Sequence, residues 1–282
     1  MTYLEISRQL AEAGVESPEW DAALLMEHFC GVDATLARMD PERDYPSEEL
    51  ERAVWARASR YPLQYLLGTW QFYRQTYEVS PDCLIPRSDT EALVDDAIHR
   101  LPEGARFLDL CTGSGCIAIS ILAERPDTTA LAVDKFPATL ALAERNAVRN
   151  GVRDRFGPLL ADVLDPAAIR LGAGVDAILS NPPYIATDVL KGLSPEVHAE
   201  PQEALDGGID GLAFYRAILA HHAHLLKPDG FIAFEIGYDQ AAAVLALGAE
   251  QGFLDGCVLR DLGGNNRVVV LKRPKTEPNA ND

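Results

Sequence analysis

The sequence has few basic residues and no long apolar run. Its 282 residues include 25 Lys and Arg against 43 Asp and Glu, which gives a formal net charge of −18. Nucleic-acid binding depends on many Lys and Arg contacts to phosphates, so this charge argues against duplex DNA as a stable partner. No apolar stretch approaches the roughly 18 residues that span a bilayer, and MTYLEISRQLAEAG does not have the pattern of a signal peptide. We therefore expect a cytoplasmic, globular protein that binds no membrane.

Cysteines in disulfide or metal-binding spacing are also absent. The five cysteines are scattered and include no CxxC pair, so we expect reduced thiols and no structural zinc. His221, His222 and His224 lack the i, i+4 spacing that places two imidazoles on one helix face. We interpret the segment LAHHAHLL as a partly exposed helix and expect no metal site.

The chain is longer than the roughly 100 to 150 residues of a typical domain, which favours a main domain and a smaller one. Helix-start signals recur in the first sixty residues: Thr2 with Glu5, Ser17 with Pro18, and Ser47 after Pro46. We predict a small helical domain over residues 1–62 that helps dock a protein substrate. Residues 63–87 are rich in aromatic and β-branched residues, which predicts a hairpin connector.

Strands and helices alternate from Ser88 onward, where Ser88 and Glu91 fit a capping box. Alternation of this kind predicts a mostly parallel sheet with helices on both faces. The fold class is thus α/β, a doubly wound seven-stranded sheet over residues 88–273. Its predicted strands are 106–110, 129–134, 156–161, 175–180, 231–236, 258–261 and 267–271. The turn LGGNN makes the last pair antiparallel, and the polar tail 274–282 is predicted to be disordered.

A glycine-rich turn follows the first of these strands. In FLDLCTGSGCIAIS, backbone N–H groups converge on the start of a helix, which is a common ligand site. Gly113, Gly115 and Ala118 satisfy GxGxxA, and Asp134 ends the next strand, as in a dinucleotide-binding fingerprint. The alternative is a tight strand-to-helix turn with no ligand.

Nearby carboxylates favour S-adenosylmethionine over a dinucleotide. Asp109 precedes the turn, where it could pair with the ammonium group of the methionine part and would repel a pyrophosphate. Asp134 would accept hydrogen bonds from ribose hydroxyls of either cofactor. Asp162, after the third strand, could accept from the adenine amino group or cap the next helix. We therefore predict an S-adenosylmethionine site.

The segment SNPPYI ends the fourth strand. The carboxyl ends of central strands form the ligand crevice of an open α/β sheet, so Asn181 should face the same pocket as the glycine turn. Pro182 and Pro183 fix φ and lack N–H donors, which leaves a rigid bend rich in carbonyl acceptors. The segment thus suits a ligand that carries an NH2 group. An ordinary proline-bent loop is the alternative.

Such acceptors matter for amide chemistry because the lone pair of an amide nitrogen is delocalised into its carbonyl. If the Asn181 side-chain oxygen and the Pro182 carbonyl each accept one N–H, the nitrogen is held and its lone pair can turn towards a methyl donor. Tyr184 can shield the planar group from water. No strong general base is required, because the proton becomes acidic only as the N–C bond forms.

Several segments together resemble one family. DLCTGSGCIAIS, AVD, SNPPYI, PLQYLLG and LIPRSDTEALV look like the protein-(glutamine-N5) methyltransferases that modify peptide-chain release factors. The resemblance runs from GVESPEWDAALLMEH to DLGGNNRVVVL. It implies methyl transfer from S-adenosylmethionine to the glutamine amide nitrogen of a Gly-Gly-Gln motif, and so a role in translation termination. NPPY alone is shared with enzymes that methylate adenine amino groups in DNA.

The resemblance also implies site roles. It implies that the methionine and ribose parts of the cofactor lie in a cradle formed by Cys111, Thr112, Gly113, Ser114 and Gly115. Asp134 would bind the ribose hydroxyls, and adenine would lie along Asp162 and Val163. Asn181 would also contact the cofactor. Val163 departs from members with an aromatic residue there. The substrate glutamine would lie against Asn181, Pro182, Pro183 and Tyr184, near Arg87, Thr90 and Glu91.

Other functions stay open. A sister branch methylates a ribosomal protein, although PLQYLLG and RDLGGNNRVVVL favour the release-factor branch. A nucleic-acid amino-group methyltransferase is opposed by the net charge of −18. A non-catalytic S-adenosylmethionine-binding protein is disfavoured because both motifs are intact. We expect a monomer.

Overall fold

The computed structural model describes residues 1–273, so the tail predicted to be disordered lies outside the described residues. The chain divides into two compact units. One contains Met1–Thr69 and Leu193–Glu200, and the other contains Trp70–Gly192 and the chain from Pro201 onward. The first unit thus includes a segment that the sequence pattern places within the second domain. None of the helices in residues 1–273 is both long and apolar enough to cross a membrane.

The first unit is helical, as expected. It contains α1 (Tyr3–Glu12), α2 (Pro18–Cys30), α3 (Ala34–Met39), α4 (Glu48–Ala58), α5 (Leu63–Leu67) and, from the later segment, α9 (Pro195–His198). The predicted capping box forms, because the Glu5 amide donates to Thr2 Oγ1 at 3.1 Å and the Thr2 amide donates to Glu5 Oε2 at 2.9 Å. Ser47 accepts from the Leu50 amide at 3.2 Å and caps α4.

The predicted hairpin region is only partly extended. Residues 63–67 form helix α5, and the two-stranded sheet of β1 (Thr69–Phe72) and β2 (Gln75–Glu78) follows. Pro62 lies at the N-cap of α5, and Gly68 ends the helix in a left-handed conformation with its N–H on the Gln64 carbonyl. A proline before and a glycine after the segment favour a short helix. The aromatic and β-branched composition of the region instead led to the prediction of strands.

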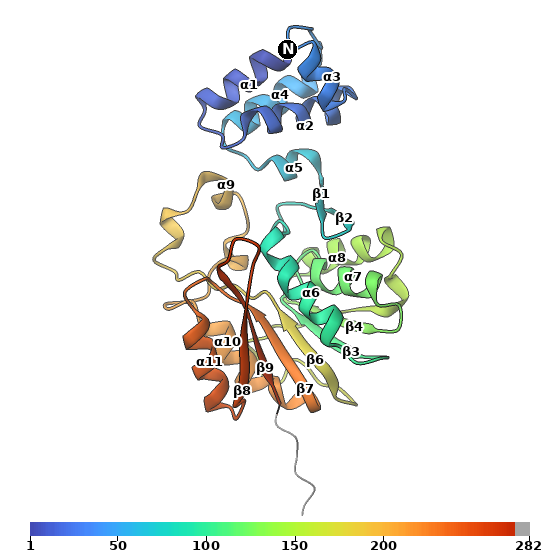
Figure 1. Ribbon diagram of the computed structural model, residues 1–282, viewed down its shortest axis with the longest axis vertical. Coiled ribbons are helices and arrows are strands. Elements are labelled where there is room, and N and C mark those ends of the chain that lie inside the picture. The colour runs from blue at the N-terminus through green and yellow to red at the C-terminus, as the bar shows by residue number, and fades with distance from the viewer. Residues whose placement is uncertain (274–282) are drawn as a thin grey trace, which may run out of the picture. The chain divides into compact units, whose positions relative to one another are not determined.

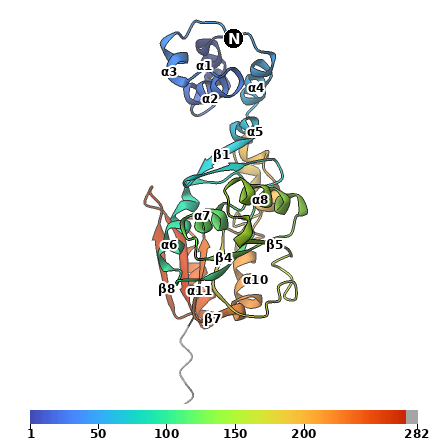
Figure 2. The same ribbon diagram turned by 90° about the vertical axis from the view of Figure 1, so that its right-hand side faces the viewer.

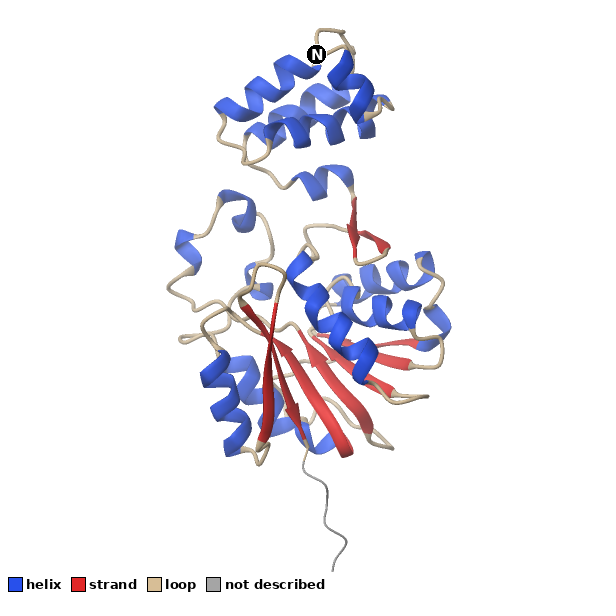
Figure 3. Ribbon diagram, in the orientation of Figure 1, coloured by secondary structure: helices blue, strands red, loops and turns tan. Residues whose placement is uncertain are grey.

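The second unit contains the predicted seven-stranded sheet, in the order β5-β4-β3-β6-β7-β9-β8 (Figures 1 and 3). Neighbours are parallel up to β7, and β9 is antiparallel to both β7 and β8. The strands are β3 (Arg106–Leu110), β4 (Thr129–Asp134), β5 (Phe156–Leu160), β6 (Val175–Ser180), β7 (Leu226–Glu235), β8 (Asp255–Arg260) and β9 (Asn266–Lys272). The predicted fold class is therefore confirmed.

Two strands begin several residues earlier than predicted. β7 starts at Leu226 because the segment KPDG, which is typical of a turn, lies inside the strand, with Asp229 at φ +65° and a register shift at its start. β8 starts at Asp255, and its first three residues are exposed. An edge strand of this kind lacks the apolar alternation that marks a strand in the sequence.

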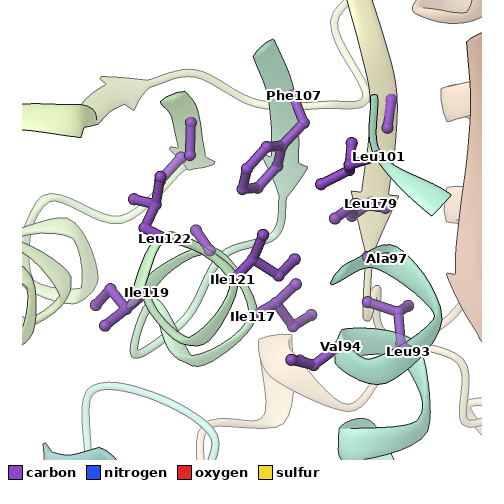
Figure 4. Packing of buried hydrophobic residues seen from close by; sticks show 14 of the residues in the cluster. Leu93, Val94, Ala97, Leu101, Phe107, Ile117, Ile119, Ile121, Leu122 and Leu179 are labelled. Carbon is purple, nitrogen blue, oxygen red and sulfur yellow. The ribbon is translucent and has the colours of Figure 1, made fainter. Parts of the chain in front are cut away.

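Helices cover both faces of the sheet, as α/β alternation requires (Figure 2). On one face α6 (Glu91–Arg100), α7 (Cys116–Glu124) and α8 (Pro137–Arg149) contribute to one apolar cluster, where Val94, Ile117 and Leu179 pack together (Figure 4). On the other face lie α10 (Ala213–His221) and α11 (Ala241–Glu250). The capping box predicted at Ser88 is wrong. Residues Ser88–Thr90 form a 3-10 turn, η1, and the Glu91 carboxylate instead accepts from the Tyr73 amide at 2.9 Å.

The strand register gathers four loops at one edge of the sheet. Leu110 lies beside Val133 on β4 and Ser180 on β6, and Asp134 lies beside Leu160 on β5. The segments that leave these strands therefore meet at the carboxyl edge, where ligands bind in this class of fold.

Candidate active site

The glycine-rich turn after β3 requires unusual backbone angles. Cys111, Gly113 and Gly115 have φ values of +59°, +56° and +81°. A Cβ on Gly115 would lie 2.7 Å from the Ile119 side chain and 3.3 Å from Ala143 Cβ, so glycine allows α7 and α8 to pack closely here. Because Cys111 holds a left-handed conformation that costs energy for a residue with a side chain, the surrounding fold must impose it.

A buried asparagine fixes this turn. Asn146 on α8 is fully buried, and its Nδ2 donates to the carbonyls of Ser114 and Glu78, both at 3.0 Å. Its Oδ1 accepts from the Glu78 amide at 2.7 Å. Asn146 therefore ties the turn to β2. Sequence reasoning missed it, because an asparagine inside a helix has no local pattern that reveals such distant partners.

Asp109 lies beneath the turn and outside the pocket lining. Its Oδ2 accepts from the Thr112 hydroxyl at 2.6 Å and from the Ala118 amide at 3.2 Å. Its Oδ1 is buried and has no hydrogen-bond partner among residues 1–273. Burial raises the pKa of Asp109 to about 7. The observed contacts brace the turn, and the contact with a cofactor ammonium stays a prediction.

Two of the predicted carboxylates, unlike Asp109, line the pocket. Asp134 ends β4 and accepts from the amides of Gly113 and Phe136, each at 3.1 Å, so every oxygen keeps a lone pair for a further donor. Burial raises its pKa despite these N–H groups. Asp162 accepts from the Leu164 amide at 2.9 Å and closes a turn, so the alternative in which it caps a helix is wrong.

One pocket at the carboxyl edge brings most of the predicted residues together. Those that line it are Arg87, Thr90, Cys111, Thr112, Gly113, Ser114, Asp134, Asp162, Val163, Asn181 and Pro183. Gly115, Pro182 and Tyr184 lie outside this lining, like Asp109. The Tyr184 hydroxyl instead lies 3.5 Å from Glu235 Oε1, and burial raises the pKa of Tyr184 to about 12, so the phenol is neutral.

The Asn181 side chain is oriented by a neighbour. Its Nδ2 donates to Thr90 Oγ1 at 3.2 Å, which leaves Oδ1 as an acceptor. The Pro182 carbonyl likewise has no hydrogen-bond partner within residues 1–273. The loop behind the motif holds it in place, because Gln240 Nε2 donates to the Tyr184 carbonyl at 2.9 Å.

Some lining residues were not predicted. Phe136, which is 38% exposed, follows Asp134 by two positions and lines the pocket. Its aromatic ring supplies there what the aliphatic Val163 cannot. The sequence signal that could have predicted this role is an aromatic residue directly after the carboxylate that ends a strand. Segments 82–86 and 201–204 also contribute, and their loop sequences gave no such signal. Burial raises the pKa of the Cys111 and Cys116 thiols, so neither is a ready nucleophile.

The histidine segment differs from its prediction. α10 ends at His221, and His222 is fully buried with Nε2 2.8 Å from the Val163 carbonyl. Burial lowers the pKa of His222, which favours the neutral ring. Within residues 1–273, no cluster of three His, Cys, Asp or Glu side chains could hold a metal ion.

Comparison with known proteins places these features in a family. Residues 3–68 match the family model described as PrmC N-terminal domain, and residues 89–206 match the methyltransferase small domain. The release factor glutamine methyltransferase of Geobacter sulfurreducens is 40% identical over 266 residues, covering 92% of this chain and 91% of that protein. That of Moorella thermoacetica is also 40% identical, covering 95% and 96%.

A solved structure supports the fold alone. A methyltransferase from Pyrococcus furiosus is 16% identical, covers 70% of this chain and 88% of its own, and superimposes with a TM-score of 0.51. The curated relatives, by contrast, match nearly the full length at 40% identity. The chain therefore belongs to the family of release factor glutamine methyltransferases.

Proposed function

We propose that the protein transfers a methyl group from S-adenosylmethionine to the side-chain amide nitrogen of the glutamine in the Gly-Gly-Gln motif of peptide-chain release factors. The observation that carries this proposal is a pair of acceptors after β6. Asn181 Oδ1 and the Pro182 carbonyl accept nothing within residues 1–273, and Asn181 lines the same pocket as the glycine turn. Two acceptors at one edge of a cofactor pocket suit the two N–H groups of a primary amide.

The pocket fits S-adenosylmethionine. Gly113 has open space where a Cβ would stand, so a ligand can approach the turn closely. Asp134 keeps lone pairs for two ribose hydroxyls, and Asp162 with Val163 would lie along the adenine. Phe136 would add an aromatic contact to the same ring. When bound, the cofactor supplies an electrophilic methyl group.

The residues of the chain would prepare the glutamine for this methyl group. Asn181 and Pro182 hold its two N–H groups, which fixes the nitrogen and favours the developing positive charge. As the N–C bond forms, the bond between the methyl group and the cofactor sulfur would break and leave S-adenosylhomocysteine. The nitrogen would then have become acidic and would release its proton to solvent. The neutral Tyr184 is placed by its hydrogen bond to Glu235 and would exclude water from the amide.

The same geometry suits other planar amino groups, so substrate choice rests on the relatives. The names of these relatives specify release factors, which favours this substrate over a ribosomal protein. The net charge of −18 opposes a nucleic-acid substrate. We further propose a cytoplasmic monomer in which residues 1–62 help dock the protein substrate.

Label transfer from methyl-labelled S-adenosylmethionine to a purified release factor tests the proposal. The control substrate is the same factor with the Gly-Gly-Gln glutamine changed to alanine, beside ribosomal proteins and duplex DNA. We expect label on the unaltered factor alone. Label only on a ribosomal protein or DNA would replace the substrate but keep the amide-holding chemistry, and label on none would overturn the proposed activity.

The Asn181→Ala variant tests the acceptor pair. It should lower the methylation rate by roughly 10²–10³-fold, as loss of one preorganised polar contact does. Cofactor affinity should change little, because the turn and Asp134 are untouched. Single-turnover kinetics and calorimetric titration measure the two quantities. A variant that keeps more than about a third of the wild-type rate would contradict the role, because a threefold loss of rate is far smaller than the expected loss of roughly 10²–10³-fold.

A further inference from the structure

The histidine segment contains a buried side chain to which the proposed activity assigns no role. His222 directly follows α10, and its main chain is held on both sides. Its N–H donates to the Ile218 carbonyl and its carbonyl accepts from the Leu225 amide, each at 2.9 Å. The ring is fully buried, whereas His221 is partly buried and His224 is exposed. His222 alone of the three is therefore enclosed by the fold.

The contact of the ring fixes the position of its hydrogen. His222 Nε2 lies 2.8 Å from the Val163 carbonyl oxygen, and a carbonyl can only accept a hydrogen bond. The ring, which burial keeps neutral, must therefore carry its one hydrogen on Nε2. Nδ1 is then an acceptor, and it is buried with no hydrogen-bond partner within residues 1–273.

The unpaired Nδ1 makes histidine an unfavourable residue for filling this space. A buried polar atom without a partner destabilises the folded protein, and a phenylalanine would fill similar space with no such atom. Histidine offers one feature that phenylalanine lacks, which is the N–H group that binds Val163. The bond to Val163 is therefore the contribution that offsets the unpaired nitrogen.

Val163 belongs to a turn that follows an edge strand. β5 is the outermost strand of the sheet, so the turn after it has a neighbouring strand on one side only. Within the turn, the Asp162 side chain accepts from the Leu164 amide and the Asp162 carbonyl accepts from the Asp165 amide. These bonds fix the shape of the turn but attach it to no other element. The bond from His222 attaches it to the end of α10.

The same turn borders the place proposed for adenine. Asp162 and Val163 line the pocket, and Phe214 near the start of α10 lines it too. Val163 has no aromatic ring to stack on adenine, so recognition from this side relies on the shape and polar groups of the turn. Both require a turn that is held in one position, because a preorganised wall binds a ligand more tightly than a mobile one.

We propose that His222 is a positioning residue that holds the turn of Asp162 and Val163 against the adenine site and so sets the affinity for S-adenosylmethionine. Adenine is remote from the methyl group in the cofactor, so contacts with it are equally strong in the ground state and in the transition state. Loss of the bond from His222 should therefore weaken cofactor binding without slowing the reaction at saturation. This inference rests on the proposed function, because it assumes adenine beside this turn.

Three variants test the role through the dissociation constant for S-adenosylmethionine, measured by calorimetric titration. His222→Phe keeps a buried ring and removes the donor, so the constant should rise roughly 3- to 30-fold, as loss of one buried hydrogen bond does. His222→Gln can place its amide nitrogen where Nε2 stands, so it should recover most of the affinity. His222→Asn is shorter and places its amide nitrogen near Nδ1, so it should bind as weakly as His222→Phe.

His224→Phe is the matched control. His224 is exposed, lies two residues further along the chain and is outside the pocket lining. The control should bind S-adenosylmethionine as the wild-type protein does. Thermal unfolding of each variant shows whether it is folded at the temperature of the titration.

Steady-state kinetics separate positioning of the turn from general loss of structure. In His222→Phe, KM for S-adenosylmethionine should rise, whereas kcat and KM for the release factor should be unchanged, as expected for loss of uniform binding. A loosened fold would alter all three quantities.

One measurement needs no variant. Nitrogen NMR shifts of the His222 ring in the wild-type protein show which ring nitrogen carries the hydrogen. We expect it on Nε2. A hydrogen on Nδ1 would remove the donor to Val163 and overturn the proposal, even if none of the variants folds.

Failure of this inference differs from failure of the proposed function. If the wild-type protein labels no release factor, the proposed function fails and the inference falls with it. If it does label the factor, a dissociation constant for His222→Phe equal to that of the control would overturn the positioning role alone. His222→Asn that binds as tightly as His222→Gln, or a kcat that falls as far as the affinity, would overturn it as well.

Discussion

Residues of one type have different tasks at this site according to their partners. Asp109 and Asp134 both belong to the strand ends around the glycine turn. Asp109 is fully buried and accepts from Thr112 and Ala118 within the protein. Asp134 lines the pocket, where its oxygens accept from the backbone amides of Gly113 and Phe136. We therefore propose Asp134 as the carboxylate that a cofactor would contact, whereas the contacts of Asp109 hold the turn.

This difference predicts the result of Asp134→Ala. Loss of its charged hydrogen bonds to ribose hydroxyls should weaken S-adenosylmethionine binding by about 1.5–3 kcal/mol. Calorimetric titration gives the dissociation constant directly. Asp154→Ala is the matched control, because Asp154 is exposed on η2 (Arg153–Arg155) and outside the pocket lining. Equal dissociation constants for Asp134→Ala and the control would mean that another group binds the ribose.

At the scale of elements, a loop far along the chain supports the NPPY segment. A Cβ on Gly207 would lie 2.8 Å from the Pro183 carbonyl oxygen and 2.8 Å from Tyr184 Cα, and both contacts are backbone. Gly211 is similarly close to the Tyr184 carbonyl. The segment LDGGIDG is therefore glycine-rich because two backbones approach closely there.

Gly207→Ala should displace this segment. Overpacking costs about 1–3 kcal/mol of stability, and a shift of about 1 Å in a substrate-holding group can reduce the rate about 10²-fold. We expect at least a tenfold fall in kcat. Gly192→Ala is the control, since a Cβ there meets nothing within 4 Å. Thermal unfolding shows whether each variant is folded. A kcat for Gly207→Ala equal to that of the control would mean that the close packing does not position NPPY.

The sequence predicts elements well and their long-range partners poorly. Strand alternation and the LGGNN turn were sufficient for the sheet, and the parallel register then brings the Gly turn, Asp134 and Asn181 to one edge. The contacts of Asn146 and Glu235 could not be predicted, because their partners are separated by tens of residues and have no fixed spacing. The contact of Asn181 with Thr90 likewise exists only once the segments after β6 and before α6 have packed together.

At the scale of the whole molecule, the helical unit is not a simple amino-terminal domain. Arg57 on α4 is buried and pairs with Asp21 at 2.6 Å and with Glu196 at 3.0 Å, and Arg60 also binds Glu196. These arginines hold the pKa of Glu196 down to about 2. Removal of one partner from a buried pair costs about 3–5 kcal/mol. Deletion of residues 1–62 would therefore leave Glu196 without its partners, so it cannot test docking cleanly.

Point variants on the surface of the helical unit test docking instead. Trp20 and Trp55 are 55% and 69% exposed, and large exposed aromatic residues are typical of binding surfaces. The double variant Trp20→Ala/Trp55→Ala should raise KM for a full-length release factor by roughly 5- to 30-fold, as truncation of interface tryptophans does. We expect a short Gly-Gly-Gln peptide to occupy the pocket alone, so kcat/KM for the peptide should not change.

Leu254→Ala is the control for loss of an exposed apolar side chain, because Leu254 is 85% exposed and belongs to the other unit. Steady-state kinetics with both substrates and thermal unfolding of each variant complete the comparison. If the tryptophan variant and the control have equal KM values for the full-length factor, residues 1–62 do not dock the substrate through this surface. If kcat/KM for the peptide falls equally, the tryptophans act on the catalytic site rather than on recognition of the protein.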